Sequence, residues 1–167
     1  MKTSPQTDKI SLKEKIIKHG SQQGYKAVSV DFQEAKKDDF TNSERFLKLF
    51  CTEITLKLGL ENRLAQYFNG LKTGNLKCSN YFQQYLLPEI PTPLVLVLYN
   101  VELILEHQAI ANNFFGLLRA WHNKAANNNT WQKVRLVIVH SKNICLTDNT
   151  AFNVGDVIEF PEPEAGQ

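Results

Sequence analysis

The sequence is poor in cysteine, has no long uninterrupted apolar segment and carries almost no net charge. Its cysteines, Cys51, Cys78 and Cys145, are odd in number and widely spaced. This excludes a disulfide framework and favours a reducing compartment, so we expect a cytoplasmic protein. The longest apolar segment is interrupted by Glu102, well short of the roughly 20 residues that cross a bilayer. The N-terminus is polar, and we expect neither a membrane span nor a secretory segment.

The weak charge also argues against several kinds of partner. The formal charge of +2 arises from 19 basic and 17 acidic residues spread along the chain, which gives no electrostatic footprint for nucleic acid. The lysine-rich first helix has no interleaved aromatic residues on which bases could stack. His107, His122 and His140 lack cysteine or carboxylate partners at the spacing of zinc ligands. We therefore expect no nucleic-acid partner and no metal.

The 167 residues, 43% of them hydrophobic, suit one globular domain. Apolar and β-branched runs predict strands at 25–32, 94–99, 134–140 and 157–160. Between them, capping boxes at Ser11 and Thr41 predict helices ending near Gly20 and Gly59. Further helices are predicted at 60–69, from Tyr81 to Pro88 and around 114–121, with a loop at 71–79. Strands that alternate with helices imply a three-layer α/β fold, a parallel sheet with helices on both faces.

The segment LVLVLYNVELIL, residues 94 to 105, is the most informative stretch. Its branched apolar run follows Pro91 and Pro93 and predicts a strand buried on both faces. In nucleotide hydrolases such a strand ends in an aspartate that holds Mg²⁺, commonly followed by a glutamate. Here the strand ends in Tyr99 and Asn100. Neither residue replaces a hard anionic oxygen ligand well. The strand therefore ends where a catalytic site would lie, but without the residues that would bind Mg²⁺.

Several segments together resemble the AAA-like P-loop ATPase domain of large signalling proteins best known from photosynthetic bacteria. The resemblance extends from about Lys9 to Phe160 and rests on five stretches: GYKAVSVDF (24–32), YFQQYLLP (81–88), FFGLLRAWH (114–122), RLVIVHS (135–141) and AFNVG (151–155). It implies a P-loop NTPase-like fold. In active relatives it also implies a phosphate-binding Walker A loop, a Mg²⁺-binding Walker B strand and a sensor residue.

The resemblance places Lys9 at the Walker A lysine, where it would be a vestige of a nucleotide site together with Ser11. Asp8 stands at the preceding glycine and Thr3 at the first glycine, while Ile10 replaces the hydroxyl residue that binds Mg²⁺. An acidic side chain at Asp8 would face the phosphates. The tight turn and the metal hydroxyl are therefore both lost.

The Walker B strand and the sensor motif also depart from the family pattern. Tyr99 and Asn100 stand where the resemblance implies the Walker B acids, and Glu102 occupies a nearby acidic position. Ser141 is sensor-like, but residues 142 and 143 are not the Thr-Glu pair that usually follows. Because Mg²⁺ supplies several kcal/mol of transition-state stabilisation, we expect hydrolysis to be lost and no cofactor to be needed; weak ATP binding is the alternative.

The resemblance also implies a central first strand before the Walker A loop, and Met1 to Asp8 contains no apolar run. We therefore expect a single incomplete AAA-like domain over 1–167, with 1–8 disordered or extended and 161–167 as a frayed tail. An incomplete sheet leaves backbone groups unpaired. The last strand could move over to pair, the C-terminal segment could be loosely held, or another chain could donate a strand.

Taken together, these features predict a catalytically inactive pseudo-ATPase domain that acts as a protein-interaction or regulatory module, through the incomplete sheet edge by binding a protein partner or by self-association. Two alternatives remain open at this point. One is a nucleotide-dependent switch ATPase domain whose site is completed by a partner. The other is a truncated remnant without selected activity.

Overall fold

A computed structural model describes residues 5–139, with side chains from Glu14 onward. A parallel sheet lies at its centre. Within the described residues this sheet has three strands in the order β1-β2-β3, namely β1 (Lys26–Asp31), β2 (Leu94–Tyr99) and β3 (Val134–Val139). Three of the four predicted strands are thus confirmed to within about two residues. The fourth, at 157–160, and the tail at 161–167 lie outside the described residues.

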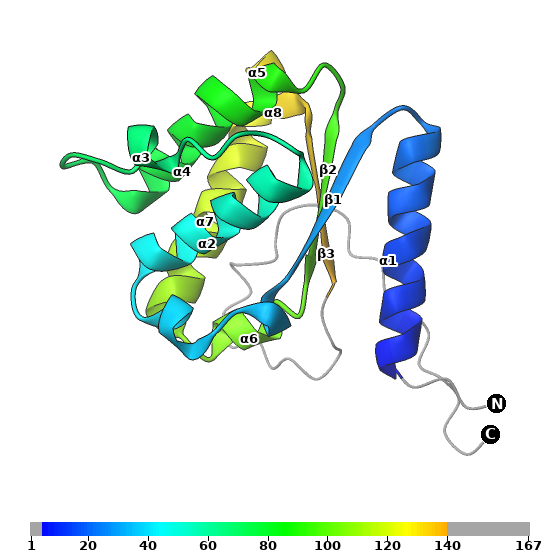
Figure 1. The fold of residues 1–167 in the computed structure, drawn as a ribbon, viewed down its shortest axis with the longest axis horizontal. Coiled ribbons are helices and arrows are strands. Elements are labelled where there is room, and N and C mark those ends of the chain that lie inside the picture. Colours follow the sequence, from blue (N-terminus) through cyan, green and yellow to red (C-terminus); the bar gives the residue numbers. More distant parts are fainter. Residues whose placement is uncertain (1–4, 140–167) are drawn as a thin grey trace.

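Helices cover both faces of the sheet, which confirms the predicted three-layer α/β class (Figure 1). On one face lies α1 (Pro5–Gln22), drawn in dark blue, and on the other lie α2 (Ser43–Lys57), α4 (Gly74–Tyr81) and α7 (Gln108–Ala125). Shorter elements connect them: η1 (Phe32–Glu34), η2 (Lys37–Phe40), α3 (Leu64–Tyr67), η3 (Phe82–Leu86), α5 (Leu87–Glu89), α6 (Glu102–Leu105) and α8 (Asn129–Gln132).

β2 is buried on both faces along its whole length. Its residues alternate between the two layers, since successive side chains of a strand point to opposite faces. Leu94, Leu96 and Leu98 join the main core, whereas Val95, Val97 and Tyr99 form a smaller cluster on the other side with Ile16 of α1. This is the pattern predicted from the apolar run, and it makes β2 the central strand of the described sheet.

The main core is rich in aromatic side chains. The Phe114 ring makes edge-to-face contacts with Phe32, Phe46 and Phe50, at centroid distances of 5.7, 5.0 and 5.0 Å. Such pairs contribute about 0.5–1.5 kcal/mol each beyond the area they bury. The stripe Phe114, Leu117, Leu118 and Trp121 is buried, as the helical spacing predicted.

Both predicted capping boxes are wrong in their position. α1 begins at Pro5, so Ser11 lies inside the helix and residues 5 to 8 are helical, neither disordered nor extended; proline is favoured in a first helical turn because its missing N–H is not needed there. α2 is capped by Asn42, whose Oδ1 accepts from the Arg45 N–H at 2.9 Å. Thr41 instead closes η2 by donating its hydroxyl to the Asp38 carbonyl at 2.6 Å.

The predicted loop at 71–79 is also wrong, because α4 begins at Gly74. Thr73 provides the N-cap, its hydroxyl accepting from the Leu76 N–H at 3.3 Å. The helical segment predicted from Tyr81 to Pro88 is confirmed and ends one residue later, at Glu89: the chain widens into the π-helical turn η3 and continues as α5, with Pro88 in its first turn. A π turn relieves the clash that a proline makes with the preceding helical turn.

Candidate functional site

The carboxyl ends of the strands meet at one edge of the sheet, the usual place for ligands in open α/β folds. The strands are in register, so that Asp31 at the end of β1 pairs with Tyr99 at the end of β2, and Tyr99 with Val139 at the end of β3. Tyr99 and Asn100, which the sequence singled out, therefore lie where the fold would place catalytic groups.

Asn100 is held by its backbone and by its side chain. Its φ of 57° lies in the left-handed region, which asparagine adopts more readily than most other non-glycine residues. Its side-chain amide donates to Asp31 Oδ1 at 2.6 Å. The same oxygen accepts from the Gln33 N–H at 2.9 Å. The hydrogen bond joins the ends of two adjacent strands, and it occupies one of the two Asp31 carboxylate oxygens.

Tyr99 lies in the small cluster between β2 and α1 and is 4% exposed. Burial, and secondly the negative charge of Asp31, raise the pKa of its hydroxyl to about 12. The side chain is therefore a neutral phenol at physiological pH. It cannot provide the anionic oxygen that a Mg²⁺ ion requires at this position.

Within residues 14–139 the remaining acidic groups do not assemble into a metal site. Glu102, the nearby acid noted in the sequence, begins α6, and one of its carboxylate oxygens is shielded from solvent. Among the described residues, no three of the histidine, cysteine, aspartate and glutamate side chains gather closely enough to hold a metal ion. The edge as described offers hydrogen-bonding amides and a phenol rather than a hard-cation site.

Lys9 and Ser11, the two vestigial Walker A residues, are placed only by their backbone. Both lie within α1, at its fifth and seventh residues counted from Pro5. Only the first four N–H groups of an α-helix lack an intrahelical acceptor, so the backbone amides of these two residues belong to the helix rather than to a phosphate-binding loop. The sensor-like Ser141 lies outside the described residues.

Asp31 is the site residue whose role the sequence did not predict. In the sequence it is only the acidic residue near the end of the predicted strand 25–32, whereas in the structure it accepts the Asn100 amide and caps η1. A signal was available, since Asp31 and Asn100 both follow apolar strands and parallel strands end at the same edge of a sheet. What was missing was the information that these two strands are neighbours.

A family model described as an AAA-like domain matches residues 1–167. No curated protein and no solved structure matches the chain. None of the helices in the described part of the chain is both long enough and apolar enough to cross a membrane.

Proposed function

The chain belongs to the AAA-like domain family, and on that premise we propose that it is a catalytically inactive member, a pseudo-ATPase that serves as a protein-interaction or regulatory module. Both Walker motifs are degenerate in this proposal. As part of it, the protein works in the cytoplasm, a reducing compartment that suits the free thiols of Cys51 and Cys78.

The hydrogen bond between Asn100 and Asp31 is the observation that carries the proposal. In an active site of this type the end of β2 would supply carboxylates to Mg²⁺, and the metal would neutralise the charge that develops on the phosphates. Here Asn100 donates to Asp31 Oδ1 at 2.6 Å, and Tyr99 is neutral and buried. The pairing of Asn100 with Asp31 supports a structural rather than a catalytic role.

The two outer strands suggest where a partner would bind. At β1, Lys57 of α2 donates from its ammonium group to the backbone carbonyl of Ser29. A lysine placed at a sheet edge opposes further strand pairing. β3 differs, because the apolar Leu136, Val137 and Ile138 are partly exposed and, within residues 5–139, β3 pairs with β2 alone. We therefore assign the interaction to β3, by addition of a strand from a second polypeptide.

Calorimetric titration of the full chain with ATP tests the catalytic part of the proposal. We expect no saturable heat at millimolar ATP, no difference between Mg²⁺ and EDTA, and no release of phosphate. Binding with a micromolar Kd that requires Mg²⁺ would contradict the proposal, because such binding needs the anionic ligands that Tyr99 and Asn100 do not provide. The metal-free titration is the matched control, since it keeps the same protein and the same nucleotide.

A further inference from the structure

The packing of α2 against α4 brings two cysteines together in the core. The start of α4 lies close to α2 at Gly74, where an added Cβ would lie 3.3 Å from Leu47 Cδ1 and 3.6 Å from the Glu44 Cα. Glycine at this position lets the start of α4 lie against the backbone of α2. The contact fixes the distance between the two helices at one end.

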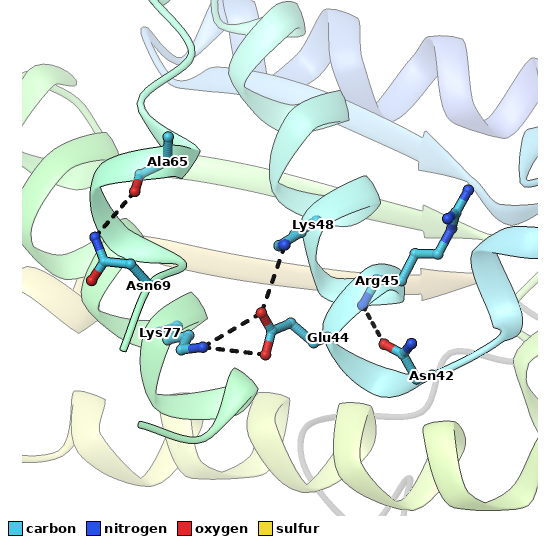
Figure 2. Close-up of polar contacts among 7 residues, drawn as sticks. All are labelled: Asn42, Glu44, Arg45, Lys48, Ala65, Asn69 and Lys77. Atoms are coloured by element: carbon cyan, nitrogen blue, oxygen red, sulfur yellow. Dashed lines mark hydrogen bonds and ion pairs between the residues drawn. The ribbon is translucent and has the colours of Figure 1, made fainter. Parts of the chain in front are cut away.

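Polar contacts hold α2 and α4 together on both sides of the two cysteines. Near the start of α2, Glu44 forms an ion pair with Lys77 at 3.2 Å, and Lys77 is only 5% exposed; Figure 2 shows the Glu44 carboxylate between Lys77 and Lys48. Further along, the hydroxyls of Thr55 and Tyr81 share a buried hydrogen bond of 2.8 Å. The two helices therefore have little freedom to separate or to slide.

Cys51 and Cys78 lie between these contacts. Their sulfur atoms are 3.5 Å apart and both side chains are completely buried. Burial, and then the neighbouring thiol, raise the pKa of Cys51 well above its usual value, so Cys51 is a thiol at rest. A disulfide needs the two sulfurs at about 2.05 Å. The sulfurs must therefore approach by about 1.5 Å from their contact in the reduced protein.

We propose that Cys51 and Cys78 are a reversible oxidation site, at which a small peroxide converts the two thiols into a disulfide that links α2 to α4. One thiol gives up its proton as its sulfur attacks a peroxide oxygen, the O–O bond breaks, the leaving hydroxide takes up that proton, and a sulfenic acid and one water form. The second thiol then attacks the oxidised sulfur and releases another water. In sum, two thiols and one hydrogen peroxide give one disulfide and two waters. The buried site selects a small oxidant over a bulky disulfide.

The bond would join residues 27 positions apart, closing a loop that includes α3. A cross-link of this length removes conformational freedom from the unfolded chain. Oxidation therefore fixes α4, and the turn η3 that continues it, against α2. Reduction by a thiol restores the starting state.

The test uses the full chain with Cys145→Ser, so that only this pair can react. The folded protein is treated with hydrogen peroxide in native buffer, and free thiols are then counted after unfolding in the presence of a thiol-blocking reagent. We expect the count to fall from two to zero. A peptide map should show Cys51 linked to Cys78, and the Tm should rise and return to its initial value with dithiothreitol.

Cys51→Ser and Cys78→Ser, each in the Cys145→Ser background, are the matched controls. Peroxide should form no internal link in either, and neither Tm should rise. The proposal is overturned if both thiols remain countable after peroxide, if the linked peptide forms only in urea, or if the products are sulfinic acid or intermolecular dimers. Each of these results would mean that the folded contact does not lead to a bond.

Discussion

The Asn100 side-chain amide donates a hydrogen bond to Asp31 Oδ1 at 2.6 Å, across the ends of two parallel strands, from a backbone with a φ of 57°. The bond therefore depends on a conformation that few residues adopt easily. Asn100 contributes to this edge of the sheet in two ways: its side chain makes the hydrogen bond, and its backbone adopts the left-handed conformation. Mutation can separate the two contributions.

We expect Asn100→Ala to be more destabilising than Asn100→Gly. Both variants lose the hydrogen bond, at a cost of about 0.5–1.5 kcal/mol. Alanine adds the left-handed penalty of about 1–2 kcal/mol, which glycine avoids. Urea unfolding at neutral pH measures both. Equal free energies of unfolding for the two variants would show that the backbone at Asn100 is not under this constraint.

Tyr99 should give the protein a stability that is lost in alkali. Its pKa is raised from about 10 to about 12 in the folded state, so between these values the unfolded chain releases the proton first. Stability is thus fully present below about pH 10 and falls as the pH rises through this window. Relative to Tyr99→Phe, the wild type should lose on the order of 1 kcal/mol between about pH 8 and about pH 11.

Urea unfolding of both proteins at the two pH values makes this measurement. Tyr81, whose pKa is also raised by burial, is present in both and cancels in the comparison. A constant difference between wild type and Tyr99→Phe across the range would mean that the Tyr99 hydroxyl is not buried in solution.

The sequence predicted the strands well because their signal is local. β2 is buried on both faces, so its run of apolar residues identified both the strand and the unusual residues at its end, Tyr99 and Asn100. α4 was missed because Gly74 and Asn75 are poor helix formers. The start of this helix depends instead on the contact of Gly74 with α2. Local propensity gave no sign of that contact.

The same limit applies to pairs of residues. The partnership of Asp31 with Asn100 spans 69 positions and that of Cys51 with Cys78 spans 27, and each depends on which elements are neighbours. The periodicity of apolar residues in a single sequence predicts strands and helices. It does not show which of these elements lie next to one another. The sequence accordingly predicted no disulfide framework for the cysteines, and it gave no role to Asp31.

Two glycines provide a matched test of the α2–α4 contact. Gly116 lies within α7 and has nothing within 4 Å of an added Cβ, so Gly116→Ala should stabilise by about 0.5–1 kcal/mol through helix propensity. At Gly74 the added Cβ meets the buried Leu47 and the backbone of Glu44. Gly74→Ala should therefore destabilise, by about 1 kcal/mol. Thermal unfolding measures the stability of both variants. If Gly74→Ala proved as stable as Gly116→Ala, the close contact at Gly74 would be contradicted.

The assignment of the interaction to β3 can be tested by changing one edge at a time. A lysine on an outer strand opposes pairing, and Lys57 already provides this at β1 through its bond to the Ser29 carbonyl. At β3 the partly exposed Val137 has no such neighbour among the ion pairs and hydrogen bonds described for residues 14–139. If β3 carries the interaction, Val137→Lys should abolish self-association, whereas Lys57→Met should leave it unchanged.

Size-exclusion chromatography with light scattering, over a series of protein concentrations, measures both variants against the wild type. We expect the wild-type mass to rise with concentration, because the proposal has the β3 edge pair with another copy. Circular dichroism would confirm that Val137→Lys is folded, since a lysine at a partly buried position also costs stability. A wild type that stays monomeric throughout would contradict self-association through β3. Association increased by Lys57→Met and unaffected by Val137→Lys would place the contact at β1, where loss of the lysine exposes the carbonyls that it had covered.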